Sequence, residues 1–540
     1  MMFAGTGTLI RLILRRDRAK LPIWLFAVVL SLVAMVPLLQ NVYGDAASIM
    51  VMYQTFSANP AGIFLAGPMD APTFGASMTI ETTMWWGLAI AFMNTLFIIR
   101  HTRQNEEMGA QELVLSGRAH RGSALASALI VAFLVNAVMA ALIAIGLIVV
   151  QAPLDGADVW LYGAAFGAFG MVWACIAAVV AQFVQSARSA NGVLASLIGL
   201  AFLLRGVGDF LGHADEQGVI QAEWPSLLSP FGWLQSTRAL TFPDWSPLII
   251  TMVASILFSL LAFWLLSMRD VGSGILPPRR GRSRASNFLR TPFGLTWKLQ
   301  KNVLIGWGMS IVTMAATNGA LVPAMGGVYE ESEQMRHLIE AMGGTGAIIP
   351  SFLAAMLAMM VLMVLAYVLQ ALGRLRNEEV NGHVEQLLAT RFSRLKWLSL
   401  HSLVVLGGSI ILLSLAGGVM ALVVSLASDM SLSVSEYVLA SLSYMPVVLV
   451  FVGLYIALFG LMPRTAGLVG WIYFGYVTFA LWVAPMLGLN EWITDLSLLS
   501  HVAAVPVEPV IWCPLIVFCA IGVVLAAGGV IAFKRRDTSF

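Results

Sequence analysis

Apolar stretches long enough to cross a lipid bilayer recur along almost the whole chain, separated by short polar segments. A helix needs about 20 residues to span the ~30 Å hydrocarbon core, at about 1.5 Å per residue. Twelve stretches of about this length are present. They cover residues 21–43, 82–100, 122–150, 158–182, 189–205, 247–268, 303–323, 349–370, 397–425, 435–462, 465–487 and 511–533. Because they are continuously apolar rather than alternating, they predict spanning α-helices and not the strands of a membrane barrel.

The composition agrees with this pattern. Hydrophobic residues make up 59% of the 540 positions and charged residues only 11%, far from the mixture that is typical of soluble domains. The formal net charge of +2 argues against a nucleic-acid partner. We therefore predict an all-α polytopic protein of the lipid bilayer.

The distribution of basic residues predicts the topology. With the spans above, the connecting segments fall alternately on two sides, and one side collects 27 of the 30 lysines and arginines. By the positive-inside rule this side is cytoplasmic. Both termini are then expected in the cytoplasm, as an even number of spans requires.

The chain contains an internal repeat, since segments of its first half recur in the same order about 270 to 285 positions later. Asn105-Glu106-Glu107-Met108-Gly109 recurs as Asn377-Glu378-Glu379-Val380-Asn381, and Ser226–Ser229 as Ser497–Ser500. Each half ends with an Arg-Asp pair, at 269–270 and 536–537. We expect a first six-helix half at 1–270, a cytoplasmic linker at 271–295 and a second six-helix half at 296–540. Such a parallel repeat has its axis along the membrane normal, and a central pathway between the halves is expected.

Two flanking segments have a recognisable pattern of their own. Ahead of the first span, Leu9, Ile10, Leu12 and Ile13 are interspersed with Arg11, Arg15, Arg16 and Arg18. This arrangement suits an amphipathic helix on the inner leaflet, and equally a simple signal-anchor flank. The Pro- and Trp-rich segments 206–246 and 488–510 suit either short helices at the outer side or interfacial aromatic belts.

The chain shows no chemistry of its own. Its lysines do not follow glycines, so it lacks the G-x-x-x-x-G-K-[ST] loop that cradles phosphates. Cys175, Cys513 and Cys519 form no CxxC and have no histidine cluster beside them, which argues against metal or redox chemistry. We predict no catalytic residues, no metal site and no cofactor bound by this chain.

The repeated Asn-Glu-Glu segments lie in corresponding cytoplasmic loops, between the second and third spans of each half. A short helix there could project acidic side chains towards a soluble partner. Charged residues beside a membrane often do no more than solvate helix ends. Their recurrence in both halves, followed each time by a further glutamate and two arginines (Arg118 and Arg121, Arg391 and Arg394), favours docking.

Taken together, these features resemble ABC-2 type exporter permeases, in the fused two-half form of actinobacterial polyketide-antibiotic and tetracycline-type multidrug exporters. The resemblance covers nearly the whole chain. It depends on the E-E-x-G-x-x-E loop after the second span of each half, the Ser-Leu-Leu-Ser segments and the closing Arg-Asp pairs. In the second loop Asn381 takes the glycine position and Gly382 follows it.

The resemblance implies a permease without a nucleotide-binding site, in the bacterial plasma membrane. Two copies of a separately encoded ABC ATPase, with ATP and Mg, would bind each chain and move the halves between inward- and outward-facing states. The coupling residues implied are Glu106, Glu107, Glu112, Glu378, Glu379 and Glu385. Reversing the charge of both glutamate pairs is expected to uncouple ATP hydrolysis from transport.

A Met-rich and aromatic set on three spans is the candidate wall of a pathway for hydrophobic small molecules, because such side chains repack around varied ligands. Ordinary helix packing is the competing interpretation of each member. The candidates are Trp85, Trp86, Phe92 and Asn94 on the second span, Met356, Met360, Met363 and Tyr367 on the eighth, and Trp471, Phe474 and Trp482 on the eleventh. Asn94 is the best single polar candidate, though an interhelical hydrogen bond would explain it equally well.

The function predicted first is ATP-driven export of amphipathic compounds such as antibiotics. Export of an endogenous lipid or metabolite by the same machinery is the second possibility. A proton-coupled secondary transporter is a third; against it stand the scarcity of acids within the spans and a missing G-x-x-x-D-[RK]-x-G-[RK] loop. A membrane-embedded enzyme would need a convergent catalytic set, and the seven histidines are scattered.

Overall fold

The computed structural model describes the chain with short gaps. The described residues are 4–57, 60–117, 120–154, 156–214, 220–270, 272–276, 284–331, 345–390, 392–428, 430–486, 490–503, 505 and 507–536. They divide into two compact units, Met1–Gly281 and Arg282–Phe540. The Pro-Pro-Arg-Arg-Gly-Arg part of the expected linker, residues 277–282, lies outside the described residues.

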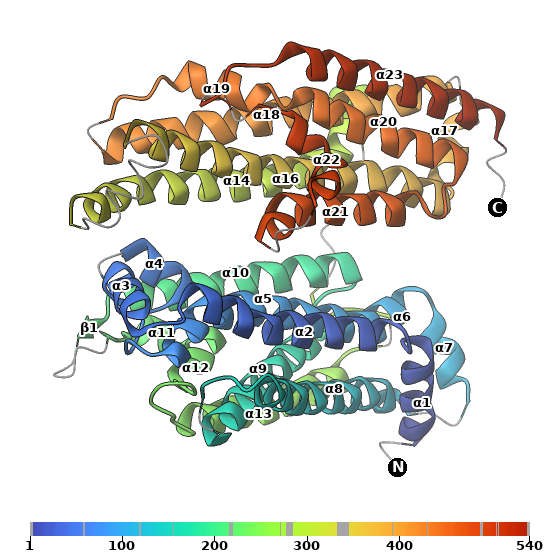
Figure 1. Cartoon of the computed structure of the whole chain (residues 1–540). Helices are drawn as coiled ribbons and strands as arrows, with labels where there is room; N and C mark the ends of the chain where they lie inside the picture. Colours follow the sequence, from blue (N-terminus) through green and yellow to red (C-terminus); the bar gives the residue numbers. More distant parts are fainter. Residues whose placement is uncertain are drawn as a thin grey trace. The chain divides into compact units, whose positions relative to one another are not determined.

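The first unit is a helical bundle with one two-stranded antiparallel ribbon. Its helices are α1 (Thr6–Arg16), α2 (Lys20–Val42), α3 (Ala46–Ser57), α4 (Pro60–Ala66), α5 (Phe74–His101), α6 (Arg103–Glu107), α7 (Ala110–Leu115), α8 (Arg121–Val149), α9 (Gly156–Phe183), α10 (Ala187–Phe210), α11 (Trp224–Leu227), α12 (Pro230–Ser236) and α13 (Ser246–Met268). Strands β1 (His213–Ala214) and β2 (Ile220–Gln221) pair after α10. Figure 1 shows the short elements gathered at the two ends of the long helices, with α3, α4, α11 and α12 at one end and α1, α6 and α7 at the other.

The second unit is built from long helices as well. It contains η1 (Phe288–Arg290), α14 (Pro292–Glu331), α16 (Thr345–Val380), α17 (His383–Leu388), α18 (Arg394–Ala427), α19 (Val434–Leu442), α20 (Met445–Leu461), α21 (Ala466–Met486), α22 (Glu491–Asp495), η2 (Leu498–His501) and α23 (Trp512–Arg535). In this unit α17 lies at the end where α23 and the chain finish (Figure 1).

The helices account for the predicted spans. Within the described residues, eleven helices are long and apolar enough to cross a membrane, and the expected eleventh span coincides with the shorter apolar helix α21. The expected tenth span is interrupted between α19 and α20. Pro446 is the second residue of α20, where its missing N–H is harmless because the first N–H groups of a helix have no partner within it. The protein is therefore all-α and multi-pass. The orientation of the termini remains a prediction.

A central helix carries the core of each unit. In the first unit α9 packs against α5, α8 and α13, and Tyr162, Phe166, Phe169 and Trp173 on it are almost completely buried. In the second unit α16 has this place, with Met360, Val361 and Tyr367 in the core cluster. Both α9 and α16 are buried on most sides, and this agrees with the apolar residues that occur on every side of their membrane-spanning parts.

Glycines allow the backbones of α20 and α23, the closest helix pair of the second unit, to approach each other. A Cβ atom at Gly453 would lie 2.3 Å from the carbonyl oxygen of Gly522, and one at Gly460 would lie 2.3 Å from that of Gly529. Small residues let two backbones approach, which drives helix association where lipid removes the hydrophobic effect. This explains the glycines of the last span.

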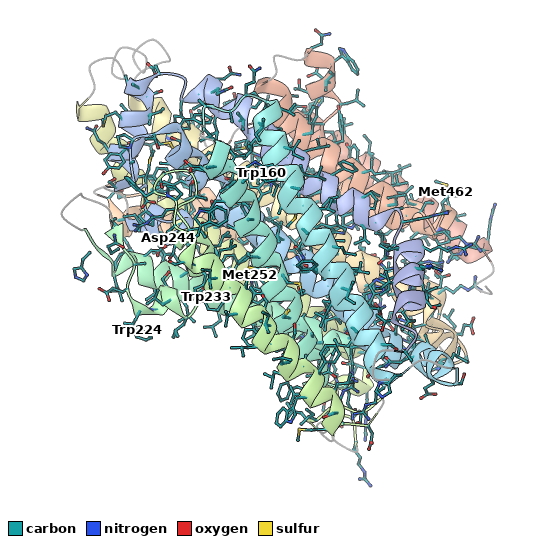
Figure 2. The ribbon with its side chains drawn as sticks, turned by 90° about the horizontal axis from the view of Figure 1, so that it is seen from below. Trp160, Trp224, Trp233, Asp244, Met252 and Met462 are labelled. Atoms are coloured by element: carbon teal, nitrogen blue, oxygen red, sulfur yellow. The ribbon has the colours of Figure 1, made fainter. Side chains whose placement is uncertain are left out.

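The described part of the segment 206–246 contains, after the end of α10, the two short strands β1 and β2 and the two short helices α11 and α12. Figure 2 shows Trp224, Trp233 and Asp244 at the end of the first unit where α13 begins. The backbone N–H and hydroxyl of Ser246 both donate to the Asp244 carboxylate at 2.8 Å, and these hydrogen bonds lower the pKa of Asp244. Helices α3 and α4, between the first two spans, were not predicted.

Candidate functional site

In each unit, the second long helix is followed by a short helix that projects from the end of the bundle. In the first unit α5 is followed by α6 and α7, and in the second α16 is followed by α17. The turn before the last of these helices requires a left-handed residue: Gly109 has φ +70° and Gly382 has φ +72°. Glycine adopts this conformation without the steric cost that a Cβ atom brings. The two predicted docking loops are thus built alike.

The first ion-pair cluster consists of Arg103, Glu106 and Arg269. The Glu106 carboxylate accepts hydrogen bonds from both guanidinium groups, with Arg269 Nη2 at 2.6 Å. All three side chains are at most 4% exposed. Arg269 also donates to Gln182 Oε1 at 2.8 Å, so it joins the loop to the ends of both α9 and α13. A buried charge needs such partners, because burial without them is costly.

The second ion-pair cluster consists of Arg376, Glu379 and Arg536. The Glu379 carboxylate accepts from Arg376 at 3.2 Å and from Arg536, which also donates to the Phe459 carbonyl at 2.9 Å. Glu379 is 4% exposed. The arginine of the closing Arg-Asp pair therefore has the same partner in both units, a glutamate of the loop.

This equivalence corrects the alignment of the repeat. The Asn-Glu-Glu match pairs Glu106 with Glu378, whereas the ion pairs and the glycine turn pair Glu106 with Glu379 and Gly109 with Gly382. Asn381 therefore does not replace the turn glycine. Two further arginines fit the corrected register, since Arg121 donates to the Leu266 carbonyl and Arg394 to the Phe533 carbonyl.

The six predicted coupling residues differ in burial: two are turned inward, three are exposed and Glu378 is partly buried. Glu106 and Glu379 are turned inward, against the expectation that these acids project to a partner, because each satisfies two arginines. Glu107, Glu112 and Glu385 are exposed.

The remaining loop residues make local contacts. Glu107 accepts from the Ala187 backbone N–H, at the start of α10, at 3.0 Å. Glu378 is partly buried between His383, at 2.9 Å, and Arg374, at 3.3 Å. The predicted arginines Arg118 and Arg391 lie outside the described residues.

Part of the predicted pathway set lines one groove of the second unit. This second-unit groove has a volume of about 500 Å³ and lies among α14, α16 and α21. Its lining includes Met363, Trp471, Phe474 and Trp482 of the predicted set. Met360 and Tyr367 instead belong to the core, and Met356 packs against it. A cavity of this size with aromatic and Met walls has the usual dimensions of a small-molecule site.

The first-unit candidates do not form one site. Trp85 is 51% exposed, while Trp86 Nε1 donates to the Val28 carbonyl and the Ser31 hydroxyl at 3.1 and 3.0 Å. Phe92 packs against the core cluster of this unit. Asn94 is buried and exchanges two hydrogen bonds with Asn136 of α8, which is the interhelical alternative considered for it.

Two features of the first unit were missed from sequence. The first-unit groove, about 650 Å³, lies among α8, α9 and α13, with Phe133, Met171, Met252 and Phe263 in its lining; Figure 2 shows Met252 on α13. Small residues that form its floor, such as Gly167, gave no chemical signal. The second feature is a fully buried ion pair, Arg205 with Asp209 at 3.0 Å. Their i,i+4 spacing was visible, but the fifth span was predicted to end at 205.

Comparisons with known proteins bear on these arrangements. A family model described as the C-terminal domain of the multidrug efflux system permease Rv1217c matches residues 289–534. The multidrug efflux system permease protein Rv1217c of Mycobacterium tuberculosis (strain ATCC 25618 / H37Rv) is 30% identical over 537 residues, which cover 99% of this chain and 95% of that protein.

Proposed function

The chain belongs to the multidrug efflux permease family, and from this premise we propose that it is the membrane-spanning subunit of an ATP-driven exporter of amphipathic compounds. Its substrates would be hydrophobic or amphipathic molecules such as antibiotics. Its partner would be a separately encoded ABC ATPase, two copies per chain, which supplies the ATP and Mg site. The plasma membrane of a bacterium is the proposed location.

The observation that carries the proposal is the loop that occurs in the same form in both units. A short helix is exposed at one end of each bundle, and a buried glutamate ties its base to the arginine that closes the sixth long helix of that unit. An ion pair that is buried in this way resists separation. A force applied to α7 or α17 would therefore reach α13 or α23 directly.

The exposed acids give the docking surface its chemistry. Glu112 on α7 and Glu385 on α17 occupy equivalent positions and face outward. Carboxylates on a projecting helix suit a basic surface of a soluble partner, because complementary charge steers encounter and fixes orientation. With one such helix in each unit, each chain would bind two copies of the ATPase.

The second-unit groove supports the substrate class. Its wall is made of Trp307, Trp471, Phe474 and Met363 with other apolar residues, and the described lining contains no charged side chain. An apolar aromatic wall favours neutral or weakly polar molecules that partition into the bilayer, since an unpaired charge in such a place would be costly.

The experiment begins with the full chain, solubilised in mild detergent from its native membranes and captured by an affinity tag. Co-purifying proteins are identified and the eluate is assayed for ATP hydrolysis. Inverted vesicles then measure drug uptake with ATP or with an imposed proton gradient. A vesicle preparation that carries the Glu112→Lys/Glu385→Lys chain is the matched control, since it keeps the buried ion pairs.

The expected result is a soluble ATPase at two copies per chain and drug uptake that needs ATP and persists when the proton gradient is collapsed. Uptake that follows the proton gradient, by a chain that purifies without an ATPase, would replace the proposal with secondary transport. ATP-dependent uptake of a native lipid or metabolite, but of none of the drugs, would keep the machinery and change its substrate.

A further inference from the structure

A small pocket lies where the N-terminal helix α1 meets the first loop. Its volume is about 100 Å³, room for a few water-sized groups. Its lining includes Leu9, Leu12, Arg16, Asn105, Gln111 and Ala124. The lining comes from α1, α6, α7 and both flanking long helices, so the pocket joins the N-terminal helix to the predicted docking loop.

Two polar groups of this pocket have unused hydrogen-bonding capacity. Gln111 is 6% exposed, and its Oε1 atom has no hydrogen-bond partner among the described residues. A buried carbonyl oxygen without a donor is unfavourable and calls for one. Arg16 donates from Nη1 to Asn105 Oδ1 at 2.8 Å, and a guanidinium carries five N–H donors in a fork that fits phosphate.

The α1 side of the pocket is basic, whereas its α7 side carries the exposed Glu112. Arg11, Arg15, Arg18 and Lys20 are exposed on and just after α1. The acid of this segment, Asp17, is 2% exposed, forms an ion pair with Arg100 at 2.9 Å and is hydrogen-bonded to His101 at 2.6 Å. The positive charge of α1 is therefore not compensated within its own segment.

Helix α1 has the features of a helix that lies on the surface of a bilayer. It ends four residues before the first long apolar helix, α2, and exposes Leu12 and Leu14 beside its arginines. Such a helix lies at the bilayer surface, where basic side chains attract anionic headgroups.

The second unit has a pocket of about 180 Å³ at the corresponding place, and Glu378 and Trp397 line it at the positions of Asn105 and Ala124. In the corrected register, Val384 occupies the position of Gln111 and is 1% exposed. Glu378 occupies the position of Asn105 and is held by His383 and Arg374 within its own loop. The two pockets occupy equivalent places but differ in chemistry. The lining of the second includes the Glu378 carboxylate, whereas the lining of the first contains no acid and includes Gln111, so an anionic group suits the first pocket.

We propose that this pocket binds the headgroup of an anionic phospholipid that carries a free hydroxyl, such as phosphatidylglycerol. Arg16 binds the phosphate, Gln111 Oε1 accepts a hydrogen bond from the headgroup hydroxyl, and the acyl chains pass along Leu9 and Leu12. The bound lipid joins α1 to α7 and holds the first loop in place. That this position matters for ATPase docking rests on the proposed function, whereas the lipid site itself does not.

Binding is measured on the detergent-purified full-length chain by native mass spectrometry. The titrants are phosphatidylglycerol, phosphatidic acid, phosphatidylcholine and, as the soluble source of the same chemistry, glycerol 3-phosphate. Arg16→Gln removes the phosphate partner and Arg11→Gln is the matched control, because it removes the same charge from the same helix outside the pocket. Gln111→Val installs the residue type of the second unit.

Saturable binding of phosphatidylglycerol over phosphatidylcholine is expected. Arg16→Gln should weaken it about tenfold or more, as for the loss of a charge-assisted hydrogen bond, and Arg11→Gln by about twofold or less. Gln111→Val should abolish the preference for phosphatidylglycerol over phosphatidic acid.

Three outcomes would overturn the site. Equal losses in Arg11→Gln and Arg16→Gln would reduce it to a diffuse surface charge, and equal binding of phosphatidylcholine would remove the requirement for an anion. Full displacement by glycerol 3-phosphate would identify a soluble phosphate as the ligand. Each variant's thermal unfolding in detergent is recorded, so that a misfolded chain is recognised. Because no ATPase is present, failure of the proposed export function leaves this result unaffected.

Discussion

The two predicted docking loops are anchored alike but differ in their exposed faces. Both carry a buried glutamate between two arginines, a left-handed glycine and an exposed glutamate, Glu112 or Glu385. On the first loop this glutamate has apolar neighbours, since Met108 and Leu113 are 56% and 79% exposed. The corresponding positions of the second loop are Asn381 and Gln386, both polar.

The connections of the loops differ in the same way. The first loop is tied to α1 through Asn105 and Arg16 and to α10 through Glu107. In the second loop Glu378 contacts His383 and Arg374, so its extra ion pairs stay within the loop and the helix before it. We infer that the shared anchor transmits movement, while the differing faces adjust what each loop binds. The predictions below separate these two parts.

The largest effect is expected from opening an ion-pair cluster. Glu106→Ala leaves Arg103 and Arg269 buried without their partner and should destabilise the chain by about 3–5 kcal/mol. Glu379→Ala should cost less, about 1–2 kcal/mol, because Arg376 and Arg536 are 23% and 18% exposed and water can solvate them. Thermal unfolding in detergent measures both.

A double change controls for the loss of charge. Glu106→Gln with Arg269→Gln removes one charge of each sign and should be milder than Glu106→Ala alone, because one arginine, Arg103, and not two, is then left buried without the carboxylate. Equal destabilisation by Glu106→Ala and Glu379→Ala would mean that burial does not distinguish the two clusters.

The second prediction concerns the exposed acids. Glu112→Lys with Glu385→Lys should leave stability within about 0.5 kcal/mol, as exposed substitutions do. The same double variant should weaken ATPase association about tenfold or more, because like charges would face each other. Asp495→Lys, an exposed reversal on the short helix α22, is the control. If the single variants differ strongly, the two loops do not bind equivalent surfaces.

The third prediction compares the grooves of the two units. Trp471→Ala removes an aromatic wall of the second-unit groove and should lower export of a hydrophobic drug about fivefold, the equivalent of ~1 kcal/mol of lost apolar contact. Trp160→Ala is the matched control, since Trp160 is 47% and Trp471 45% exposed and Trp160 lines neither groove.

Met252→Ala tests whether the first-unit groove contributes. A loss like that of Trp471→Ala would make both grooves part of the substrate path. A change with Trp160→Ala as large as with Trp471→Ala would assign the effect to exposed tryptophans in general, and not to the groove.

The helices were predictable because the bilayer imposes a length and a composition that a sequence shows directly. The predicted stretch 122–150 and α8, Arg121–Val149, differ by one residue at each end. Helices α3 and α4 were missed because they are too short to span, so their apolar residues follow no membrane rule. The tenth span was predicted unbroken because one proline at a helix start does not lower mean hydropathy.

The site was less predictable than the fold. The sequence does not distinguish Glu106, Glu107, Glu378 and Glu379, since all four are glutamates in two similar loops. Which of them is buried depends on its contact with the arginine at the end of the sixth helix, about 160 residues away. Such contacts are set by packing. Met363, Trp471 and Phe474 line one groove, and the aromatic stripe that contains the last two is visible in the sequence. Met360, with the same chemistry as Met363, lies in the core.

The smallest predicted effect tests the register of the repeat itself. In the Asn-Glu-Glu alignment Asn381 matches Gly109, and in the structure Gly382 does. A Cβ atom at Gly382 would meet no atom within 4 Å, so only its φ of +72° resists substitution. Gly382→Ala should therefore cost about 1 kcal/mol, and Gly109→Ala should match it. Asn381→Ala, at the neighbouring exposed position, should change the unfolding temperature of the purified chain hardly at all. If Asn381→Ala were the costly variant and Gly382→Ala neutral, the glycine turn would not be shared, and the equivalence of Glu106 with Glu379 would rest on the ion pairs alone.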